Sequence, residues 1–477
     1  MSVSAVAADR SVCAPLPVLG RDVLVPLVTG GEVDYAALDY AASAPALQRV
    51  WDDVAAYAPY YGSVHRGAGY LSQLSTDLFE NSRRTIAEFL GCRIEGGPGE
   101  ARSGKGGGGR REGDQVVFTR STTDSLNLLA AVLPENTRVF VFETEHHASL
   151  LPWEQRSDVE VTYLNAPRTP QQAVDTLEKA LATREPYGPA LVCVTGASNV
   201  TGELWPVREL AAAAHAHGAR IVLDAAQLVP HHPVDLAELD VDWVAFSGHK
   251  LYAPFGAGVL AGRADWLRDA APYLAGGGAS RKVSRRTDGG VDVEWHTTAA
   301  RHEAGSPNVI GAYAIASACQ ALTEAGFDAL VAREQELIAR LRAGLAEVPE
   351  VNVLSLFGED AARVGVLSFV VEGWNSSHFA AALSAEYGIG VRDGLFCAHP
   401  LVRTLLGSEP QDPGECGAPE AAPGEKSLNA IRVSFGAGTP DEHVDRFLEA
   451  VKELVTNGAR WNYQTEDGRC VPARSAD

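Results

Sequence analysis

The stretch that decides the fold is Val241 to Gly258, which reads VDWVAFSGHKLYAPFGAG. An apolar run typical of a buried strand, Trp243 to Phe246, ends abruptly at Ser247-Gly248-His249-Lys250. A lysine after a strand is often a solvated surface residue, but small residues surround this one, so we expect Lys250 to lie in a packed pocket. A buried lysine loses its charge readily, and an uncharged amine can form a Schiff base with a carbonyl cofactor. The stretch therefore predicts Lys250 as a cofactor-binding and catalytic residue.

A second strand end lies upstream, where Ile221-Val222-Leu223 is followed by Asp224-Ala225-Ala226-Gln227. In an open parallel sheet, ligands bind beyond the carboxyl ends of the strands, so we expect Asp224 to point into the same crevice as Lys250. An aspartate beside a pyridine nitrogen keeps that nitrogen protonated. Pyridoxal 5'-phosphate is the cofactor that combines a lysine Schiff base with such an aspartate, and the two residues together predict it.

Composition and charge exclude several classes of protein. The chain has 477 residues, enough for two or three domains, and 46% of them are hydrophobic, which is typical of a soluble globular protein. The formal net charge of -21 argues against binding to nucleic acid or to an anionic membrane. No apolar run reaches the roughly 18 residues that span a bilayer, and the N-terminus has no basic region followed by an apolar core. We expect a cytoplasmic protein without a nucleic-acid or membrane partner.

The seven cysteines indicate reduced thiols. Their number is odd, they are widely scattered, and no two form a CxxC pair. This pattern favours neither a disulfide framework nor a zinc site, so we predict no metal ion.

Short apolar runs alternate with helix-like segments between residues 116 and 246. This alternation predicts an α/β fold with a mostly parallel central sheet and helices on both faces. The predicted strands are Val116–Phe118, Arg138–Phe142, Val159–Tyr163, Ala190–Val194, Arg220–Leu223 and Val241–Phe246, and the predicted helices include Thr122–Val132, Thr169–Ala182 and Val207–His217.

The pattern changes after about residue 311 and predicts a smaller α+β domain. A long helix is expected from Gly311 to Leu345, broken near Gly326, and the later elements are Arg363–Val371, Ser377–Tyr387, Ile389–Val391, Ile431–Phe435 and Pro440–Val455. The predicted division is an N-terminal segment 1–35 belonging to the small domain, a large cofactor-binding domain 36–311, a small domain 312–460 and a tail 461–477. Two inserts, a glycine-rich one at 96–113 and one at 407–426, are expected to be surface loops.

A phosphate site is predicted where the run TRSTTD, residues 119–124, follows a strand and opens a helix. Free backbone amides and hydroxyls at a helix N-terminus bind anions, although simple N-capping by Ser or Thr explains the same run. The predicted phosphate ligands are Thr122, Thr123, Ser247 and His249.

Two further strand ends carry candidate side chains. In EHHAS, residues 145–149, adjacent histidines on a strand point apart and no third metal ligand has suitable spacing, so we expect His146 to stack on an aromatic cofactor. A surface-loop histidine is the alternative. Asn199, in SNVTG at 198–202, can bond both a phenolic oxygen and a carboxylate, although Asn is also a common turn residue.

The second half of the chain contributes a thiol and two arginines. RDGLFCAHP, residues 392–400, places Cys397 after Arg392 in a glycine-containing loop. Most free cysteines are buried and inert, but cationic or titratable neighbours favour the thiolate. Arg432 interrupts an apolar strand, and a buried arginine needs a partner; a substrate carboxylate bound by its fork of N–H groups would supply one.

Together these motifs resemble the class V aminotransferase family of pyridoxal-phosphate enzymes. Within it the chain is most similar to the cysteine desulfurases of the second, SufS-like group, close to the selenocysteine lyases. The resemblance runs from about Tyr35 to Ala450. It is carried by LDYAASAP (38–45), VHRGAGYLS (64–72), STTDSLN (121–127), EHHASLLPW (145–153), SNVTG (198–202), DAAQ (224–227), SGHKLYAPFGAGVL (247–260), HEAGSPN (302–308), RDGLFCAHP (392–400) and RVSFGAGTPDEHVDRF (432–447).

The resemblance implies a role for each residue that contacts the cofactor. Lys250 would hold it as a Schiff base, Asp224 would pair with the pyridine nitrogen, and His146 would stack on the ring and act in proton transfer. Gln227, and Asn199 with it, would bond the phenolic oxygen. The phosphate ligands would be joined by Ser306 from the neighbouring subunit of a homodimer, where the family usually has Thr.

The resemblance also implies the reaction. Arg432, with Asn199 and Arg392, would bind the carboxylate of L-cysteine, and Cys397 would take its sulfur, giving L-alanine and a persulfide for transfer to an acceptor protein. Leu395 and Phe396 stand where many relatives have histidines, so the proton source for the thiol is expected to differ. The alternative is another class V enzyme, namely a C–S lyase, a selenocysteine lyase, an epimerase or an aminotransferase of specialised metabolism.

Overall fold

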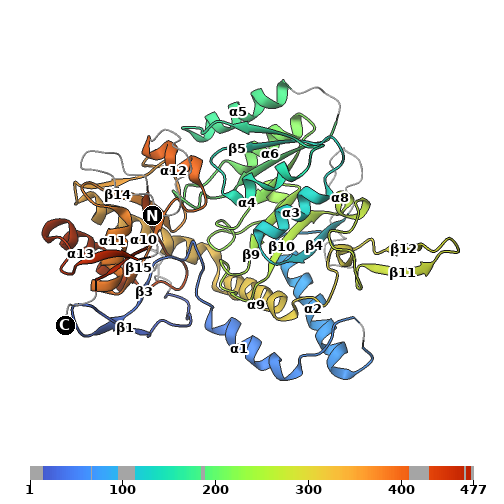
Figure 1. The fold of residues 1–477 in the computed structure, drawn as a ribbon, viewed down its shortest axis with the longest axis horizontal. Coiled ribbons are helices and arrows are strands. Elements are labelled where there is room, and N and C mark those ends of the chain that lie inside the picture. Colours follow the sequence, from blue (N-terminus) through green and yellow to red (C-terminus); the bar gives the residue numbers. More distant parts are fainter. Residues whose placement is uncertain are drawn as a thin grey trace, which may run out of the picture.

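A computed structural model describes residues 14–65, 67–94, 113–183, 188–407, 429–466 and 469–473. Figure 1 shows a large body built on one twisted sheet and a smaller body beside it, formed mainly by the C-terminal part of the chain. Of the two predicted inserts only the end residues Gly113 and Gly407 belong to the described part, so the predicted loops lie outside it.

The large body contains a seven-stranded sheet in the order β4-β10-β9-β8-β7-β5-β6. Neighbouring strands from β9 to β6 are parallel, whereas β10 is antiparallel to both β4 and β9. The predicted α/β class with a mostly parallel sheet is confirmed. The strands are β4 Asp114–Thr119, β5 Arg138–Phe142, β6 Glu160–Leu164, β7 Ala190–Thr195, β8 Arg220–Asp224, β9 Trp243–Ser247 and β10 Gly258–Arg263.

The strand β10 was not predicted, because two of its six residues are glycines. A Cβ atom at Gly258 would lie 2.7 Å from Cα of Ser121, and one at Gly262 would lie 2.1 Å from the carbonyl oxygen of Asp242. The glycines therefore allow neighbouring backbone to approach closely. Because glycine is rare in strand interiors, residue propensities did not indicate a strand here.

Alternate residues along each strand face opposite helical layers. In β5, Val139 and Val141 belong to one core cluster and Phe140 and Phe142 to another. The first core packs against α3 (Thr122–Val132) and α8 (Ala264–Asp269), and the second against α5 (Pro170–Ala182), α6 (Val207–Ala216) and α9 (Val309–Ala325). Helices thus cover both faces of the sheet, as the alternation predicted. Two more helices, α1 (Gln48–Tyr57) and α2 (Tyr70–Phe89), pack along α9.

The smaller body contains an antiparallel sheet in the order β13-β14-β17-β16. The strands are β13 Val351–Val353, β14 Val366–Val371, β17 Ala430–Ser434 and β16 Arg392–Gly394, and the helices are α10 Phe327–Ala346, α11 Ser376–Tyr387 and α13 Asp441–Asn457. The predicted break in the long helix is confirmed, since Gly326 separates α9 from α10 with a φ of 83°. The exact boundaries of the two domains remain predictions.

One expectation was wrong in this body. The segment after Arg392 was interpreted as a loop, but Arg392–Gly394 form β16 and His399–Leu406 form α12, so only residues 395–398 are loop. Pairing with β17 supplies the hydrogen bonds that make this short polar run a strand, and no local pattern reveals that pairing.

The remaining elements belong to neither of the two main sheets. A hairpin of β11 (Ser280–Arg285) and β12 (Val291–Trp295) projects from the large body in Figure 1. The others are β1 Leu24–Pro26, β2 Glu32–Asp34, β3 Ala36–Ala37, β15 Ile389–Gly390, β18 Tyr463–Glu466, β19 Arg469–Pro472, α4 His147–Leu150, α7 Leu236–Leu239, η1 Ala58–Tyr60, η2 Pro152–Gln155 and η3 Ala299–His302.

Within the described ranges, no helix is long and apolar enough to cross a bilayer. The same residues contain no group of three or more His, Cys, Asp or Glu side chains placed to hold a metal ion.

Candidate active site

A pocket of about 250 Å³ lies where the carboxyl ends of β7, β8 and β9 meet the small sheet. All predicted site residues except Ser306 line it. They are Thr122, Thr123, His146, Asn199, Asp224, Gln227, Ser247, His249, Lys250, Arg392, Cys397 and Arg432. The fold thus brings together side chains that are far apart in the sequence.

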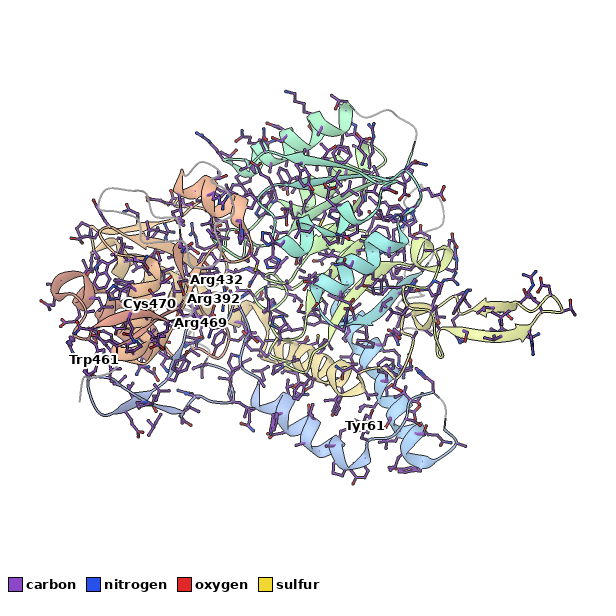
Figure 2. The ribbon with its side chains drawn as sticks, in the orientation of Figure 1. Tyr61, Arg392, Arg432, Trp461, Arg469 and Cys470 are labelled. Atoms are coloured by element: carbon purple, nitrogen blue, oxygen red, sulfur yellow. The ribbon has the colours of Figure 1, made fainter. Side chains whose placement is uncertain are left out.

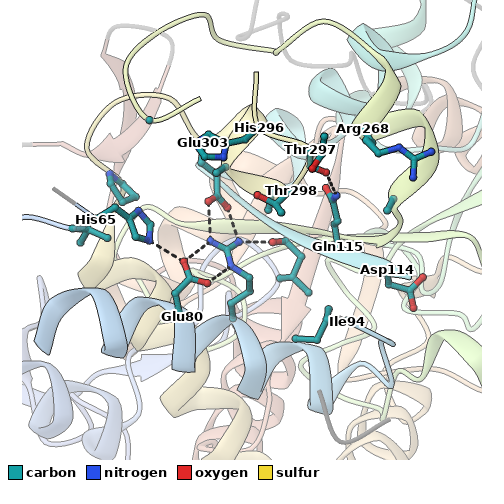
Figure 3. Close-up of a pocket in the computed structure, with 18 of the residues that line it drawn as sticks. His65, Glu80, Ile94, Asp114, Gln115, Arg268, His296, Thr297, Thr298 and Glu303 are labelled. Atoms are coloured by element: carbon teal, nitrogen blue, oxygen red, sulfur yellow. Dashed lines mark hydrogen bonds and ion pairs between the residues drawn. The ribbon is translucent and has the colours of Figure 1, made fainter. Parts of the chain in front are cut away.

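A larger cavity of about 1000 Å³ lies elsewhere (Figure 3). There Arg83 forms ion pairs with Glu80 and Glu303, and His65 contacts Glu80. Its described lining contains none of the predicted site residues, but Gly305 and Pro307, which flank Ser306, belong to it.

Lys250 lies in the tight turn that leaves β9. The N–H of Gly248 donates to the carbonyl oxygen of Ala257 at 2.8 Å, and a Cβ atom at Gly248 would lie 2.8 Å from Cγ1 of Ile315. Position 248, two residues before the lysine, therefore requires glycine. Burial lowers the pKa of Lys250 to about 8, the charge of Asp224 acts in the opposite direction, and Arg432 lowers the pKa further. The amine is accordingly a far better nucleophile near neutral pH than an ordinary lysine.

Asp224 is the last residue of β8 and is 5% exposed. Its Oδ1 accepts from the N–H of Ala226 at 2.9 Å, and its Oδ2 accepts from the hydroxyl of Ser149 at 2.5 Å. Burial, together with the nearby charge of Asp224, raises the pKa of the neighbouring Glu145 carboxyl group well above its usual range. No role was predicted for Ser149, although it lies in the same EHHAS run as His146.

His146 caps the N-terminus of α4. Its Nδ1 accepts from the N–H of Ala148 at 3.0 Å, so a neutral ring carries its proton on Nε2. Burial, followed by the charge of Lys250, lowers the pKa of His146 to about 3. The imidazole is therefore neutral at physiological pH, as a ring that stacks on an aromatic cofactor should be.

The predicted phosphate ligands gather at the first turn of α3. Ser121 is the N-cap, because its hydroxyl accepts from the N–H of Asp124 at 3.3 Å. The N–H and the hydroxyl of Thr122 each lie 2.7 Å from Oγ of Ser247, which joins the helix start to the end of β9. N-capping thus accounts for Ser121, while Thr123 and His249 line the pocket beside this turn.

Arg432 on β17 is 3% exposed, and its resident partners differ from the expected one. Its Nη2 lies 3.0 Å from Oδ1 of Asp39, and its Nη1 donates to the carbonyl oxygen of Asn199 at 3.0 Å. A substrate carboxylate was the only partner predicted for Arg432, and Asp39, which lies in the LDYAASAP motif, was not predicted. Each Nη nitrogen carries two N–H groups, so one on each remains for a carboxylate.

Arg392 lies directly opposite Arg432 in the β16–β17 pair, and the two lie next to each other in Figure 2. Gln227 donates through Nε2 to the carbonyl oxygen of Ala41 at 2.8 Å. This hydrogen bond fixes the orientation of the side-chain amide, including its acceptor oxygen Oε1. The Asn199 amide donates through Nδ2 to the carbonyl oxygen of Phe396 at 2.8 Å, so a partner in its own chain already accepts one of its N–H groups.

Cys397 is exposed and lies in the four-residue loop 395–398. The N–H of His147 donates to its carbonyl oxygen at 2.8 Å, which ties the loop to the large body. The rings of His147 and His399 lie 4.6 Å apart, close to this loop.

A family model for class-V aminotransferases matches residues 36–96 and 109–447. The chain belongs to the class-V aminotransferase family. The family is pyridoxal-phosphate-dependent, which confirms the predicted cofactor. The pocket of this chain has the groups that this cofactor needs: a helix N-terminus with hydroxyls, a buried carboxylate and an amine of lowered pKa.

Relatives within this class-V family are named cysteine desulfurases. The chain is 35% identical over 458 residues to a cysteine desulfurase from Enterobacter sp. (strain 638), covering 93% of this chain and 98% of that protein. It is 34% identical over 453 residues to a probable cysteine desulfurase from Halobacterium salinarum, with 93% and 96% covered.

Solved structures give the same result. An apo cysteine desulfurase from Thermococcus onnurineus NA1 superposes with a TM-score of 0.73 at 29% identity, covering 88% of this chain and 95% of that one. The cysteine desulfurase CsdA from Escherichia coli gives a TM-score of 0.70 at 28% identity, with 88% of this chain and 95% of that one covered. The chain therefore has the fold of these class-V enzymes.

Proposed function

We propose that this protein is a cysteine desulfurase that converts L-cysteine to L-alanine and carries the released sulfur as a persulfide on Cys397. The observation that carries the proposal is the exposed Cys397 lining the same pocket as Lys250 and Arg432. A thiol nucleophile beside a Schiff-base lysine and a carboxylate-binding arginine suits the removal of sulfur from an amino acid. The names of the relatives support the same activity.

The residues of the pocket divide the work of holding the cofactor. Bound pyridoxal phosphate supplies an electron sink that stabilises negative charge on the carbons of the substrate. Lys250 would hold it covalently, and Asp224, fixed by Ser149 and by the N–H of Ala226, would keep its pyridine nitrogen protonated. Thr122, Thr123, Ser247 and His249 would hold the phosphate, His146 would stack on the ring, and Gln227 would bond the phenolic oxygen.

Arg432 would fix the carboxylate of the substrate. Its remaining N–H groups form a fork, and Asp39 and the Asn199 carbonyl hold that fork in place. Arg392 adds positive charge from the neighbouring strand. An amine with a pKa near 8 can both release and accept protons near neutral pH, so Lys250 suits the transfer of the α-proton.

The sulfur step balances without an external oxidant. The Cys397 thiolate attacks the sulfur of the substrate, an S–S bond forms, and the bond between Cβ and that sulfur breaks. The electron pair of the broken bond stays on Cβ, which takes up a proton to become the methyl group of alanine. One thiol proton remains on the persulfide and the other enters alanine. The persulfide would then pass to an acceptor protein.

We also propose a homodimer. Exposed aromatic and aliphatic side chains gather around η1 and the start of α2, at Tyr60, Tyr61, Tyr70 and Leu71, and Tyr61 is labelled there in Figure 2. An apolar patch of this kind is typical of a contact between protein surfaces. Of the described residues, Ser306 is the predicted ligand that lies outside the pocket of its own chain, which fits its predicted role toward the phosphate of a partner. Membership of the SufS-like group is likewise a proposal, supported by the RDGLFCAHP motif.

Cys397→Ser tests the activity. The variant should keep the visible absorbance of bound cofactor but form no persulfide from L-cysteine. Mass spectrometry of the wild type after brief exposure to L-cysteine should show one added sulfur on the peptide that contains Cys397, and Cys470→Ser should behave as the wild type. If no sulfur appears on that peptide and the Cys397 variant consumes cysteine normally, a C–S lyase or another class-V activity replaces this proposal.

A further inference from the structure

The backbone around Cys397 is held in a sparsely populated conformation. Phe396 and Cys397 both have a φ of 52°, in the left-handed region that side-chain-bearing residues rarely adopt. Two such residues in succession persist only where the surrounding contacts hold them. The loop that carries the thiol is therefore positioned from outside.

Both strained residues are held by hydrogen bonds from the large body. The amide of Asn199 donates to the carbonyl oxygen of Phe396 at 2.8 Å, and the N–H of His147 donates to the carbonyl oxygen of Cys397 at 2.8 Å. Within the loop, the N–H of Ala398 donates to the carbonyl oxygen of Leu395 at 2.9 Å.

The side chain of Phe396 adds a contact with the carboxylate-binding arginine. Phe396 is 9% exposed, and the guanidinium carbon of Arg432 lies 5.0 Å from the centroid of its ring. A guanidinium over an aromatic face is attracted by the quadrupole of the ring. Arg432 also donates to the carbonyl oxygen of Asn199, so Asn199, Phe396 and Arg432 form a closed set of contacts.

We propose that Phe396 is a positioning residue, whose ring on the Arg432 guanidinium sets the place of the Cys397 thiol relative to the bound substrate. The inference rests on the proposed function and deepens it. Arg432 fixes the substrate through its carboxylate, and the same guanidinium fixes the residue that precedes the sulfur acceptor. The donor and the acceptor of sulfur are thereby aligned on one group, and small misplacements of reacting atoms lower rates strongly.

The test compares Phe396→Leu with Phe396→Tyr in the cofactor-loaded protein. Leucine keeps an apolar side chain but loses the aromatic face, whereas tyrosine keeps that face. The rate of sulfur transfer to Cys397 at saturating L-cysteine, measured by quenched mass spectrometry, should fall by roughly tenfold or more in the leucine variant while KM changes little. The tyrosine variant should recover most of the wild-type rate.

A second readout does not depend on turnover. Amide hydrogen exchange in the peptide spanning residues 395–402 should be faster in the leucine variant than in the wild type, because the loop loses one of its restraints. The tyrosine variant should exchange as the wild type does. Phe396→Met, whose flexible side chain fills irregular space, replaces the leucine variant if that protein fails to fold.

The outcomes separate this inference from the proposed function. If the wild type itself places no sulfur on Cys397, the proposed function fails. If the wild type does so and the leucine variant is equally fast, or if leucine and tyrosine slow transfer to the same extent, only the positioning role of Phe396 is overturned. A rise in KM with an unchanged rate at saturation also overturns it, because Phe396 would then act on substrate binding alone.

Discussion

The reactivity of Lys250 depends on the pKa of its amine, which burial and the charge of Asp224 shift in opposite directions. Burial favours the neutral amine, and Asp224 favours the ammonium, so that the balance leaves a pKa of about 8. At pH 7 roughly a tenth of such amines are neutral, against well under a thousandth for an ordinary lysine with a pKa near 10.4. The pKa of the amine is thus already lowered in the cofactor-free protein.

We expect the cofactor-free protein to capture pyridoxal phosphate with a pH dependence set by this amine. Only the neutral form attacks the carbonyl, so the capture rate, followed by the visible absorbance, should rise with pH and level off above a midpoint near 8. Lys250→Ala should show no such absorbance, and Lys179→Ala, on the exposed face of α5, should match the wild type. Asp224→Asn should move the midpoint down, because it removes a charge that favours the ammonium. A midpoint near 10 would contradict the assignment.

Asp224 and Ser149 should give graded losses. Asp224→Ala removes the charge that keeps a pyridine nitrogen protonated, so turnover at saturating cofactor should fall by orders of magnitude. Ser149→Ala removes only the hydroxyl that donates to Asp224, so its loss should be clearly smaller. Rates of alanine release by the three proteins check the order, and near-normal turnover of the Asp224 variant would count against its role.

At the scale of elements, the segment 198–204 joins the large body to the small one. The hydroxyl of Ser368 donates to the carbonyl oxygen of Val200, and the N–H of Val364 donates to that of Gly202 at 2.9 Å. The carboxylate of Glu203, fully buried, accepts from the N–H groups of Leu356 and Phe357. Asn199 belongs to the same segment, so these bonds also place the carbonyl that orients Arg432.

Glu203→Ala should therefore destabilise the protein strongly. It leaves buried N–H groups without an acceptor and removes the carboxylate 3.9 Å from the buried guanidinium of Arg363, a loss of about 3–5 kcal/mol for a broken buried pair. Urea unfolding of the cofactor-loaded protein measures it. Glu442→Ala, which removes an exposed ion pair with Arg21, is the matched control and should change the midpoint little. If the two variants unfold at the same urea concentration, Glu203 does not stabilise the contact between the large and the small body.

At the scale of the whole molecule, the predicted phosphate ligands do not all lie in one pocket. Gly305 and Pro307, which flank Ser306, line the larger cavity in which Arg83 forms the ion pairs shown in Figure 3. One chain alone therefore leaves this predicted ligand away from the cofactor site, and the exposed patch around Tyr61 offers a surface for a second copy.

We expect Tyr61→Glu to weaken the homodimer, because a charge in an apolar interface loses its hydration on association. Light scattering over a dilution series should show more monomer in this variant than in the wild type. Tyr163→Glu, at a comparably exposed tyrosine on the edge strand β6, is the control. Ser306→Ala should weaken cofactor binding although Ser306 lies outside the pocket of its own chain. A wild type that stays monomeric at all concentrations would refute the proposed dimer.

The amino-acid sequence by itself determined the fold class, the family, the cofactor and the residues at the strand ends. It could do so because an apolar run followed by Lys250 or Asp224 is a local signal, and parallel strands place their ends at one edge of a sheet. The break at Gly326 is local as well, since glycine adopts a positive φ without strain.

Only the tertiary structure decided the partners of those residues. Asp39 reaches Arg432, Ser149 reaches Asp224, and Asn199 reaches Phe396 across long separations in sequence, so no spacing along the chain reveals them. The strands β10 and β16 also exist through their neighbours rather than through their own composition. Local propensity and hydrophobic period report on one element at a time, whereas hydrogen bonds between elements depend on the complete arrangement of the chain.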